Sequence, residues 1–188
     1  GLSRPPVWKG GGLWVIEQDF LFHSRAQIKA ARAIEAGLDG GSGEIIVRVF
    51  EVPFAPVGAE GGTVPFSDDS TFSDGSEFAS IPVGATLTAS AALRATTLSL
   101  TMIVGALEGG ERFSITHPTK GRRLYTVSRV DGDDITIRPP LREAVDSGTE
   151  LDFTHPSVVC RLANADEFMG ALNVAHHIEA TAIWVEAF

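Results

Sequence analysis

Apolar and polar residues alternate with period two in three neighbouring segments, 113–116, 124–129 and 135–138. Alternation of this kind places one set of side chains on each face of a β-strand. The segments are separated by HPTKG at 117–121 and DGDD at 131–134, whose Asp and Gly residues favour tight turns. The pattern predicts three strands joined by hairpin turns.

The residues that follow these three strands are expected to complete a small β-barrel. The two prolines at 139–140 cannot continue the interior of a sheet. The segment 141–148, LREAVDSG, favours a short helix or helical turn, because a proline precedes it and a glycine ends it. TELDF at 149–153 then supplies a closing strand. We therefore expect residues 109–156 to form a barrel of the OB or SH3-like kind.

Further strands are expected outside this segment, from the same alternation of apolar and polar residues. They are expected at 13–22, 44–52, 89–104 and 170–187. The alanine-rich start of the third strand, 89–95, is also compatible with a helix.

One helix is expected over residues 24–38. Ser24 and Gln27 match the S-x-x-Q capping box, in which two side chains satisfy the first backbone amides of a helix. Behind this cap, apolar residues recur at helical spacing at Ile28, Ala31, Ile34 and Leu38. The chain is therefore expected to be mainly β with one flanking α-helix.

The segment 53–77 is rich in Pro, Gly, Ser and acidic residues. Connections longer than about 15 residues are uncommon in compact domains and are usually functional or disordered. This one also carries Phe54, Phe66 and Phe72, which a solvated loop does not need. We interpret it as an arm or long hairpin that is ordered against another surface, and a mobile surface loop is the alternative.

The first twelve residues form a second arm, rich in Pro and Gly. Trp8 and Trp14 flank its three consecutive glycines. These tryptophans either pack at the edge of the domain or dock on a neighbouring subunit, since exposed Trp is typical of interfaces.

Charge and cysteine content exclude several classes of protein. The net charge of −9 argues against a general surface for nucleic acid or anionic membranes, which needs a basic face. The single cysteine, Cys160, cannot form an internal disulfide, and its apolar strand favours a buried, inert thiol. No apolar run reaches the roughly 18 residues of a spanning helix, so we expect no membrane anchor.

The chain offers little catalytic or metal-binding chemistry. Its five histidines lack the spacing of a metal site, and the acidic stretch 68–77 does not fit an EF-hand. GGSGE at 40–44 misses the nucleophile elbow, and no phosphate-binding glycine loop is present. We expect no metal, no cofactor and no enzymatic activity. A pocket that joins His176 or His177 to Glu179 and Cys160 would change this expectation.

A set of motifs resembles tail proteins of long-tailed bacteriophages and prophages. The motifs are G-x-x-F-x-I at 110–115, R-x-L-Y-x-V at 122–127, I-x-I-x-P-P-L-R-x-A-V-x-x-G-T-x-L-x-F at 135–153, and R-L-A at 161–163. The upstream stretches WKGGGLW and FSDGSEF are also similar to that family. Among tail-tip components, the chain most resembles a distal tail protein, which ends the tail tube.

The resemblance implies a fold and an assembly. Distal tail proteins form a hexameric ring, in which each subunit contributes a β-sandwich with a flanking helix to the tube wall. Residues 1–108 and 157–188 would be this tube domain, and 109–156 would be an inserted barrel. The arm 53–77 would reach a neighbouring subunit or ring. The implied inter-subunit contacts are Trp8, Trp14, Phe54, Phe66 and Phe72.

The resemblance also implies partners and a location. The chain would bind copies of itself, the adjacent tail tube and the tip or baseplate hub, in a virion made in the bacterial cytoplasm. Duplex DNA would pass without specific binding, because acidic walls repel phosphate. The candidate lumen acids are Asp68, Asp69, Asp74 and Glu77.

Two other classes of function stay open. The chain could be a carbohydrate- or receptor-binding module, with Trp8, Trp14 and Trp184 stacking on sugar rings in one groove. It could also be another tail tube component or a tail-associated hydrolase, and a hydrolase requires convergent polar groups in a pocket.

Overall fold

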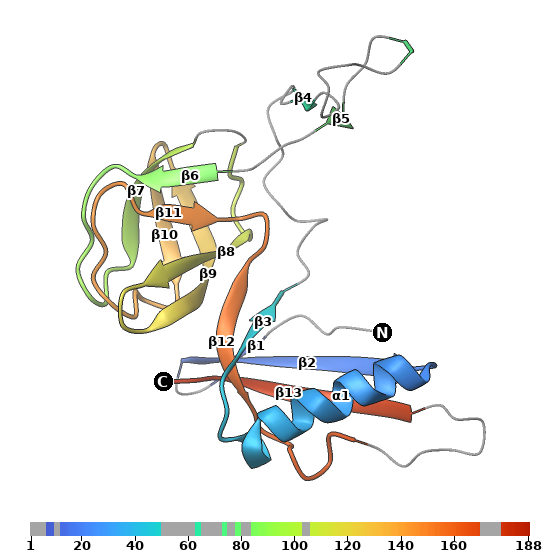
Figure 1. The fold of residues 1–188 in the computed structure, drawn as a ribbon. Coiled ribbons are helices and arrows are strands. Elements are labelled where there is room, and N and C mark those ends of the chain that lie inside the picture. The colour runs from blue at the N-terminus through green and yellow to red at the C-terminus, as the bar shows by residue number, and fades with distance from the viewer. Residues whose placement is uncertain are drawn as a thin grey trace. The chain divides into compact units, whose positions relative to one another are not determined.

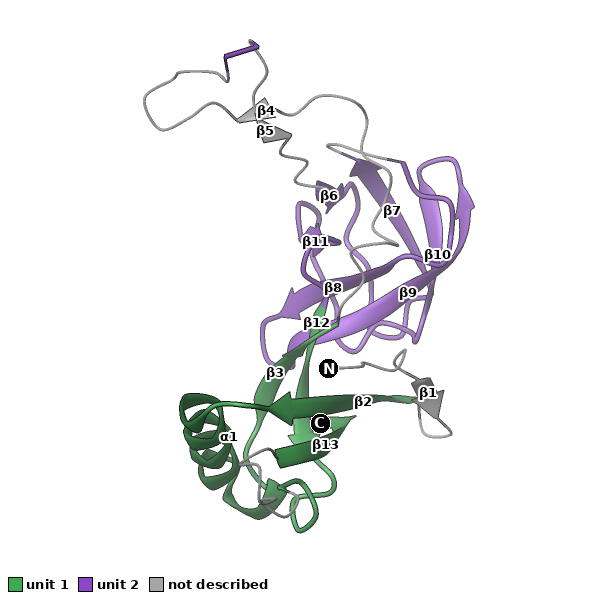
Figure 2. Cartoon of the chain, turned by 90° about the vertical axis from the view of Figure 1, so that its right-hand side faces the viewer, with its two compact units in different colours: residues 1–50, 157–188 green, residues 51–156 purple. Residues whose placement is uncertain are grey.

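The structure is a computed structural model, and it describes residues 7–9, 12–49, 63–64, 73–74, 78–79, 84–102, 106–169 and 178–188. The chain forms two compact units (Figure 2). Unit 1 contains residues 1–50 and 157–188, and unit 2 contains residues 51–156. The described residues are mainly β-strand with one α-helix, which confirms the expected class.

Unit 1 is a five-stranded antiparallel sheet with the helix on one face (Figure 1). The sheet order is β1-β2-β13-β12-β3. Its elements are β1 (Val7–Lys9), β2 (Leu13–Phe22), α1 (Arg25–Gly37), the short 3-10 helix η1 (Asp39–Gly41), β3 (Ile45–Arg48), β12 (Ser157–Leu162) and β13 (Ile178–Glu186). The described part of this unit contains a single sheet, and α1 forms a second layer against it.

Helix α1 begins at the predicted capping box. The backbone amide of Gln27 donates to the hydroxyl of Ser24 at 3.2 Å, and the Gln27 side chain accepts from the Ser24 amide at 3.1 Å. These two bonds satisfy amides that a helix start otherwise leaves without partners. The helix ends at a buried Leu38, and Gly40 follows in the left-handed region at φ 64°, which stops the helical path.

Strands β2 and β13 form the longest pairing of the sheet, from Val15 opposite Val185 to Phe22 opposite Ile178. Their even-numbered residues face α1, and the odd-numbered residues face the other way. On the helix side, Trp14, Ile16 and Trp184 are buried. The alternation expected for residues 13–22 is therefore confirmed.

Unit 2 is organised around a closed barrel of six strands in the order β10-β7-β6-β11-β8-β9. A separate pair of short strands, β4 and β5, belongs to the same unit. The elements are β4 (Thr63–Val64), β5 (Phe78–Ala79), β6 (Gly84–Leu87), β7 (Thr97–Met102), β8 (Arg112–His117), β9 (Gly121–Asp131), β10 (Asp134–Arg138) and β11 (Glu150–Asp152). The two predicted hairpin turns join β8 to β9 and β9 to β10, with Gly121 and Gly132 at positive φ.

The barrel interior is filled by side chains. Phe113 lies 5.6 Å from Tyr125 and 5.0 Å from Phe153, measured between ring centroids, and all three are buried. Leu98 and Leu100 of β7 and Ile135 and Ile137 of β10 complete the walls of this core. The barrel is therefore a packed core and not a channel.

Three expectations about the barrel were wrong. The strand expected at 89–104 was assigned to the tube domain, but its described part, β7, pairs with β6 and β10 in the barrel. The segment 141–148 is not helical, because its backbone bonds go to the distant segment 91–95. Val145 and Ala91 exchange two hydrogen bonds of 2.8 and 2.9 Å. A helix at 89–95 is also absent, and Arg94 adopts a positive φ of 66° there.

The expectation for 53–77 lies almost wholly outside the described residues, of which only 63–64 and 73–74 belong to it. The strand expected at 44–52 is described at Ile45–Arg48. The strand expected at 170–187 is described at Ile178–Glu186.

We predict that Phe113→Ala lowers the free energy of unfolding of the barrel by about 3–5 kcal/mol, because it leaves a cavity in a packed core. Leu93→Ala is the matched control, since Leu93 is 57% exposed. Urea unfolding followed by circular dichroism, with amide exchange of β8 and β9, measures the difference. Equal losses for the two variants would contradict the prediction.

Candidate binding groove

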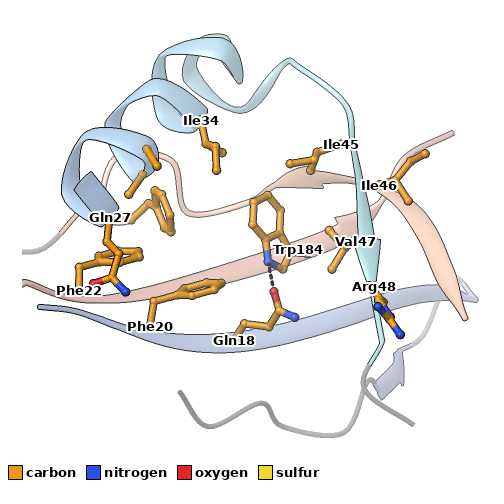
Figure 3. A pocket seen from close by; sticks show the side chains of 13 residues that line it. Gln18, Phe20, Phe22, Gln27, Ile34, Ile45, Ile46, Val47, Arg48 and Trp184 are labelled. Carbon is orange, nitrogen blue, oxygen red and sulfur yellow. Dashed lines mark hydrogen bonds between the residues drawn. The ribbon is translucent and has the colours of Figure 1, made fainter. Parts of the chain in front are cut away.

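An apolar groove of about 380 Å³ lies in unit 1 between α1 and the sheet (Figure 3). Its floor comes from β2 and β13, one wall from α1 and the other from β3. Phe20 and Phe22 extend from β2 toward the helix, and Trp184 extends from β13. The volume lies within the range of about 300–1,000 Å³ that is usual for ligand sites.

Contacts between its own residues hold the floor of the groove in place. The indole nitrogen of Trp184 donates to the Gln18 side chain at 2.9 Å, so both polar groups are satisfied although buried. The rings of Phe20 and Phe22 stack with centroids 5.8 Å apart, and Phe168 meets Phe20 edge-on at 6.4 Å. The floor is thus preformed and mostly aromatic.

The groove exists because the helix side chains above it are short. Ala30 and Ala31 line it, and a methyl group cannot bridge the distance from a helix to a sheet. Ala31 is the one buried residue within α1. Ile34 stays 45% exposed and Ile46 on β3 stays 60% exposed, both at the rim. Large aliphatic side chains are therefore left in water beside an unfilled aromatic floor.

The lining of the groove is almost wholly apolar, and Arg48 on β3 is its charged residue. Helix α1 also carries Arg25, Lys29 and Arg32, but helical spacing places these on the side away from Ala30, Ala31 and Ile34, which line the groove. The groove therefore suits an apolar occupant.

A second polar cluster lies in the barrel around His117. Its Nε2 is 2.7 Å from the hydroxyl of Tyr125, which also accepts from the backbone amide of Arg142 at 3.1 Å. The Nδ1 atom of His117 has no hydrogen-bond partner among the described residues. Desolvation lowers the pKa of His117 to about 4; Glu143 partly offsets this shift, and Arg123 adds to it. The imidazole is therefore neutral at pH 7.

Glu143 fixes the turn between β8 and β9. Its carboxylate accepts hydrogen bonds from the amide and hydroxyl of Thr119 and from the amide of Lys120, at 3.0–3.2 Å. Desolvation acts to raise the pKa of Glu143, but these bonds and His117 together lower it below its ordinary value. These hydrogen bonds hold the turn between β8 and β9 against the segment that follows β10. The cluster therefore has the features of a structural contact.

The described part of the chain contains no cluster of three His, Cys, Asp or Glu that could hold a metal. Cys160 is buried, as expected for an inert thiol. His176 and His177 lie outside the described residues. No described helix has the length and apolar character that crossing a membrane requires.

The structure places only part of the predicted contact set. Trp14 is buried within unit 1, which matches packing at the sheet edge and leaves little of it for a neighbour. The backbone of Trp8 pairs with that of Trp14. Asp74 lies at an exposed turn. The remaining predicted residues, Phe54, Phe66, Phe72, Asp68, Asp69 and Glu77, lie outside the described residues.

The saccharide-binding alternative needs exposed aromatic residues in one groove. Trp14 and Trp184 are each 4% exposed, so neither offers an open ring face to a sugar.

Sequence reasoning missed the groove. The apolar stripe of α1 correctly predicts which side of the helix faces the sheet. It does not predict whether side chains fill the space between the helix and the sheet. The available signal was the alanine content of the stripe and its flank. Ala30 and Ala31 leave little volume to pack against the three aromatic residues on the floor.

Comparison with known proteins finds no matching family model and no matching curated sequence.

We predict that His117 makes the barrel less stable as pH falls from 6.5 to about 4, by on the order of 2 kcal/mol. The sign follows from linkage: in this window the unfolded chain takes up a proton on His117 that the folded barrel does not. Below about pH 4 the effect is complete, and above 6.5 it is absent.

The measurement compares urea unfolding of wild type and His117→Gln across this window, with His155→Gln as the exposed control. The difference in free energy of unfolding between wild type and His117→Gln reports this histidine alone, because the carboxylates that titrate in the same pH range are common to both proteins. A wild-type slope that persists in His117→Gln would contradict the prediction.

Proposed function

We propose that this protein is a structural ring subunit of the tail tip of a long-tailed bacteriophage, in the position of a distal tail protein. In this role it extends the tail tube, joins it to the tip or baseplate hub, and has no enzymatic activity. The motifs quoted above, from Gly110 to Ala163, support the class of protein.

The open groove beneath α1 is the observation that carries the proposal. Monomeric proteins rarely leave a large apolar surface uncovered, and such surfaces usually mark a site for another protein. The groove occupies one side of unit 1, so a copy can fill it with a different part of its own surface. A contact between two different surfaces repeats head to tail and closes into a ring when the rotation allows.

Two strands of the sheet carry acids on the face away from α1, which supports a wall along which DNA moves. Glu17, Asp19 and Glu179 lie at odd-numbered positions of β2 and β13 on that face. Neither of these two strands contains Lys or Arg, but the register places Arg161 of the neighbouring β12 on the same face, where it pairs with Glu44. The part of the face formed by β2 and β13 would repel the phosphates of passing DNA. These three acids are better candidates for the lumen than Asp74, which lies at an exposed turn of unit 2.

We predict that the purified chain forms closed rings, alone or on tail tube protein from the same genome. Ile34→Asp should raise the dissociation constant of the ring about tenfold or more, because burying an unpaired carboxylate costs more than about 1.4 kcal/mol. Light scattering gives the mass, and electron microscopy gives the symmetry and the central opening.

The matched control is Ala33→Asp, which adds the same charge at an exposed helix position that does not line the groove. Both variants are first checked for unchanged circular dichroism. A chain that stays monomeric both alone and with the tube protein would overturn the proposal. Equal effects of Ile34→Asp and Ala33→Asp would remove the groove from its support.

A further inference from the structure

Two adjacent contacts join the end of the β8–β9 hairpin to the segment that follows β10, and a titratable side chain takes part in each. In the first contact, Nε2 of His117 lies 2.7 Å from the hydroxyl of Tyr125, which also accepts from the backbone amide of Arg142 at 3.1 Å. The side chains of His117 and Tyr125 are both buried. The Tyr125 hydroxyl therefore connects the histidine of β8 to the backbone beyond β10.

The second contact is made by the carboxylate of Glu143. It accepts from the backbone amides of Thr119 and Lys120, at 3.1 and 3.2 Å. Arg142 and Glu143 are consecutive, so both contacts end on the same part of the segment after β10. Loss of both would free the turn from that segment at one place.

Protonation of His117 is incompatible with the first contact. The neutral ring can accept the hydroxyl proton of Tyr125 at Nε2, but in the cation both ring nitrogens carry protons and this acceptor is lost. The Nδ1 atom has no hydrogen-bond partner among the described residues. The cation would therefore be buried with an unpaired N–H group, which is costly. Desolvation accordingly lowers the pKa of His117 from 6.5 to about 4.

Protonation of Glu143 acts in the same direction. Desolvation acts to raise its pKa, but the hydrogen bonds from the turn lower it below the ordinary value of 4.5, so acid weakens those bonds. Glu143 also favours a positive charge on His117, whereas Arg123 on β9 opposes it. Lys120 and Arg142 bring further positive charge to this end of the barrel. Once Glu143 is neutral, a protonated His117 faces Arg123 without the carboxylate that offset it.

We propose that acid releases the β8–β9 turn from the segment after β10 while the strands of the barrel stay paired. The backbone bonds around the turn do not titrate. Strands β8 and β9 stay paired from Arg112 opposite Thr126 to His117 opposite Gly121. Backbone hydrogen bonds of 2.8–2.9 Å tie the segment 141–145 to residues 91–95. The opening is therefore local, and it does not depend on the proposed ring function.

The test is amide hydrogen exchange of the full-length chain, followed by NMR between pH 7 and 4 and corrected for the intrinsic effect of pH on exchange. The amides of Thr119, Lys120 and Arg142 report the two contacts. We expect their protection to fall about tenfold or more from pH 6.5 to 4, because the opened state takes up protons more readily.

The dependence of exchange on urea separates local opening from unfolding of the whole barrel. A local opening exposes little surface, so exchange of these three amides should hardly change at low urea concentrations. The amides of Leu100 and Val127 donate to backbone carbonyls elsewhere in the barrel and serve as references. Their exchange should show the full urea dependence of unfolding.

Two pairs of variants assign the effect to its residues. His117→Gln should remove the pH dependence of the Arg142 amide between pH 6.5 and 4, and His155→Gln, at an exposed position, should leave it unchanged. Glu143→Gln should lower the protection of Thr119 and Lys120 at pH 7 about tenfold, because these amides lose a charged acceptor. Glu150→Gln, also exposed, should not.

Three results would overturn the inference. In the first, the protection of the three amides does not change with pH. In the second, these amides show the same urea dependence as Leu100 and Val127, so that acid acts only by unfolding the whole barrel. In the third, the pH dependence of the Arg142 amide persists in His117→Gln. Loss of protection at the three amides, without urea dependence and absent from His117→Gln at Arg142, supports it.

Discussion

The pairing of β2 with β13 is the constraint on which unit 1 depends. Residues Val15–Phe22 meet Ile178–Val185, although the bulk of the chain separates them. Closing so long a connection is entropically costly, and the continuous pairing and the burial of alternate side chains offset that cost. Strands β3 and β12 join the same sheet, so residues 51–156 form an insertion between them and bury a core of their own. The closed barrel does this, because closure leaves no strand edge unpaired.

The sequence predicted those elements whose signals are local. Ser24 and Gln27 specify the helix start within one turn, and the alternation over 113–138 specifies three strands. The prediction from sequence failed at 141–148. Leu141 and Val145 are four residues apart, which is the spacing of apolar residues on one face of a helix. Both are buried in the barrel core, and their backbone partners come from the distant segment 91–95. Similarly, alternation showed that β7 is a strand but not which sheet it joins, since sheet membership depends on partners far away in sequence.

The candidate groove was harder to predict than the fold, because it depends on the volume of side chains on both sides of a contact. The period of α1 indicated which of its residues face the sheet, and Ala31 and Leu38 are indeed buried. Period alone does not say whether the two layers fill the space between them. Ala30 and Ala31 line the space above the large rings of Phe20 and Phe22 and do not fill it. A longer aliphatic residue in place of Ala30 would have completed the core and removed the site.

An unfilled groove costs stability in an isolated subunit, and in an assembling one it becomes the source of binding energy. The net charge of −9 keeps free copies apart through general repulsion. A partner that fills the groove must therefore gain more from displacing water from its apolar lining than it loses to that repulsion.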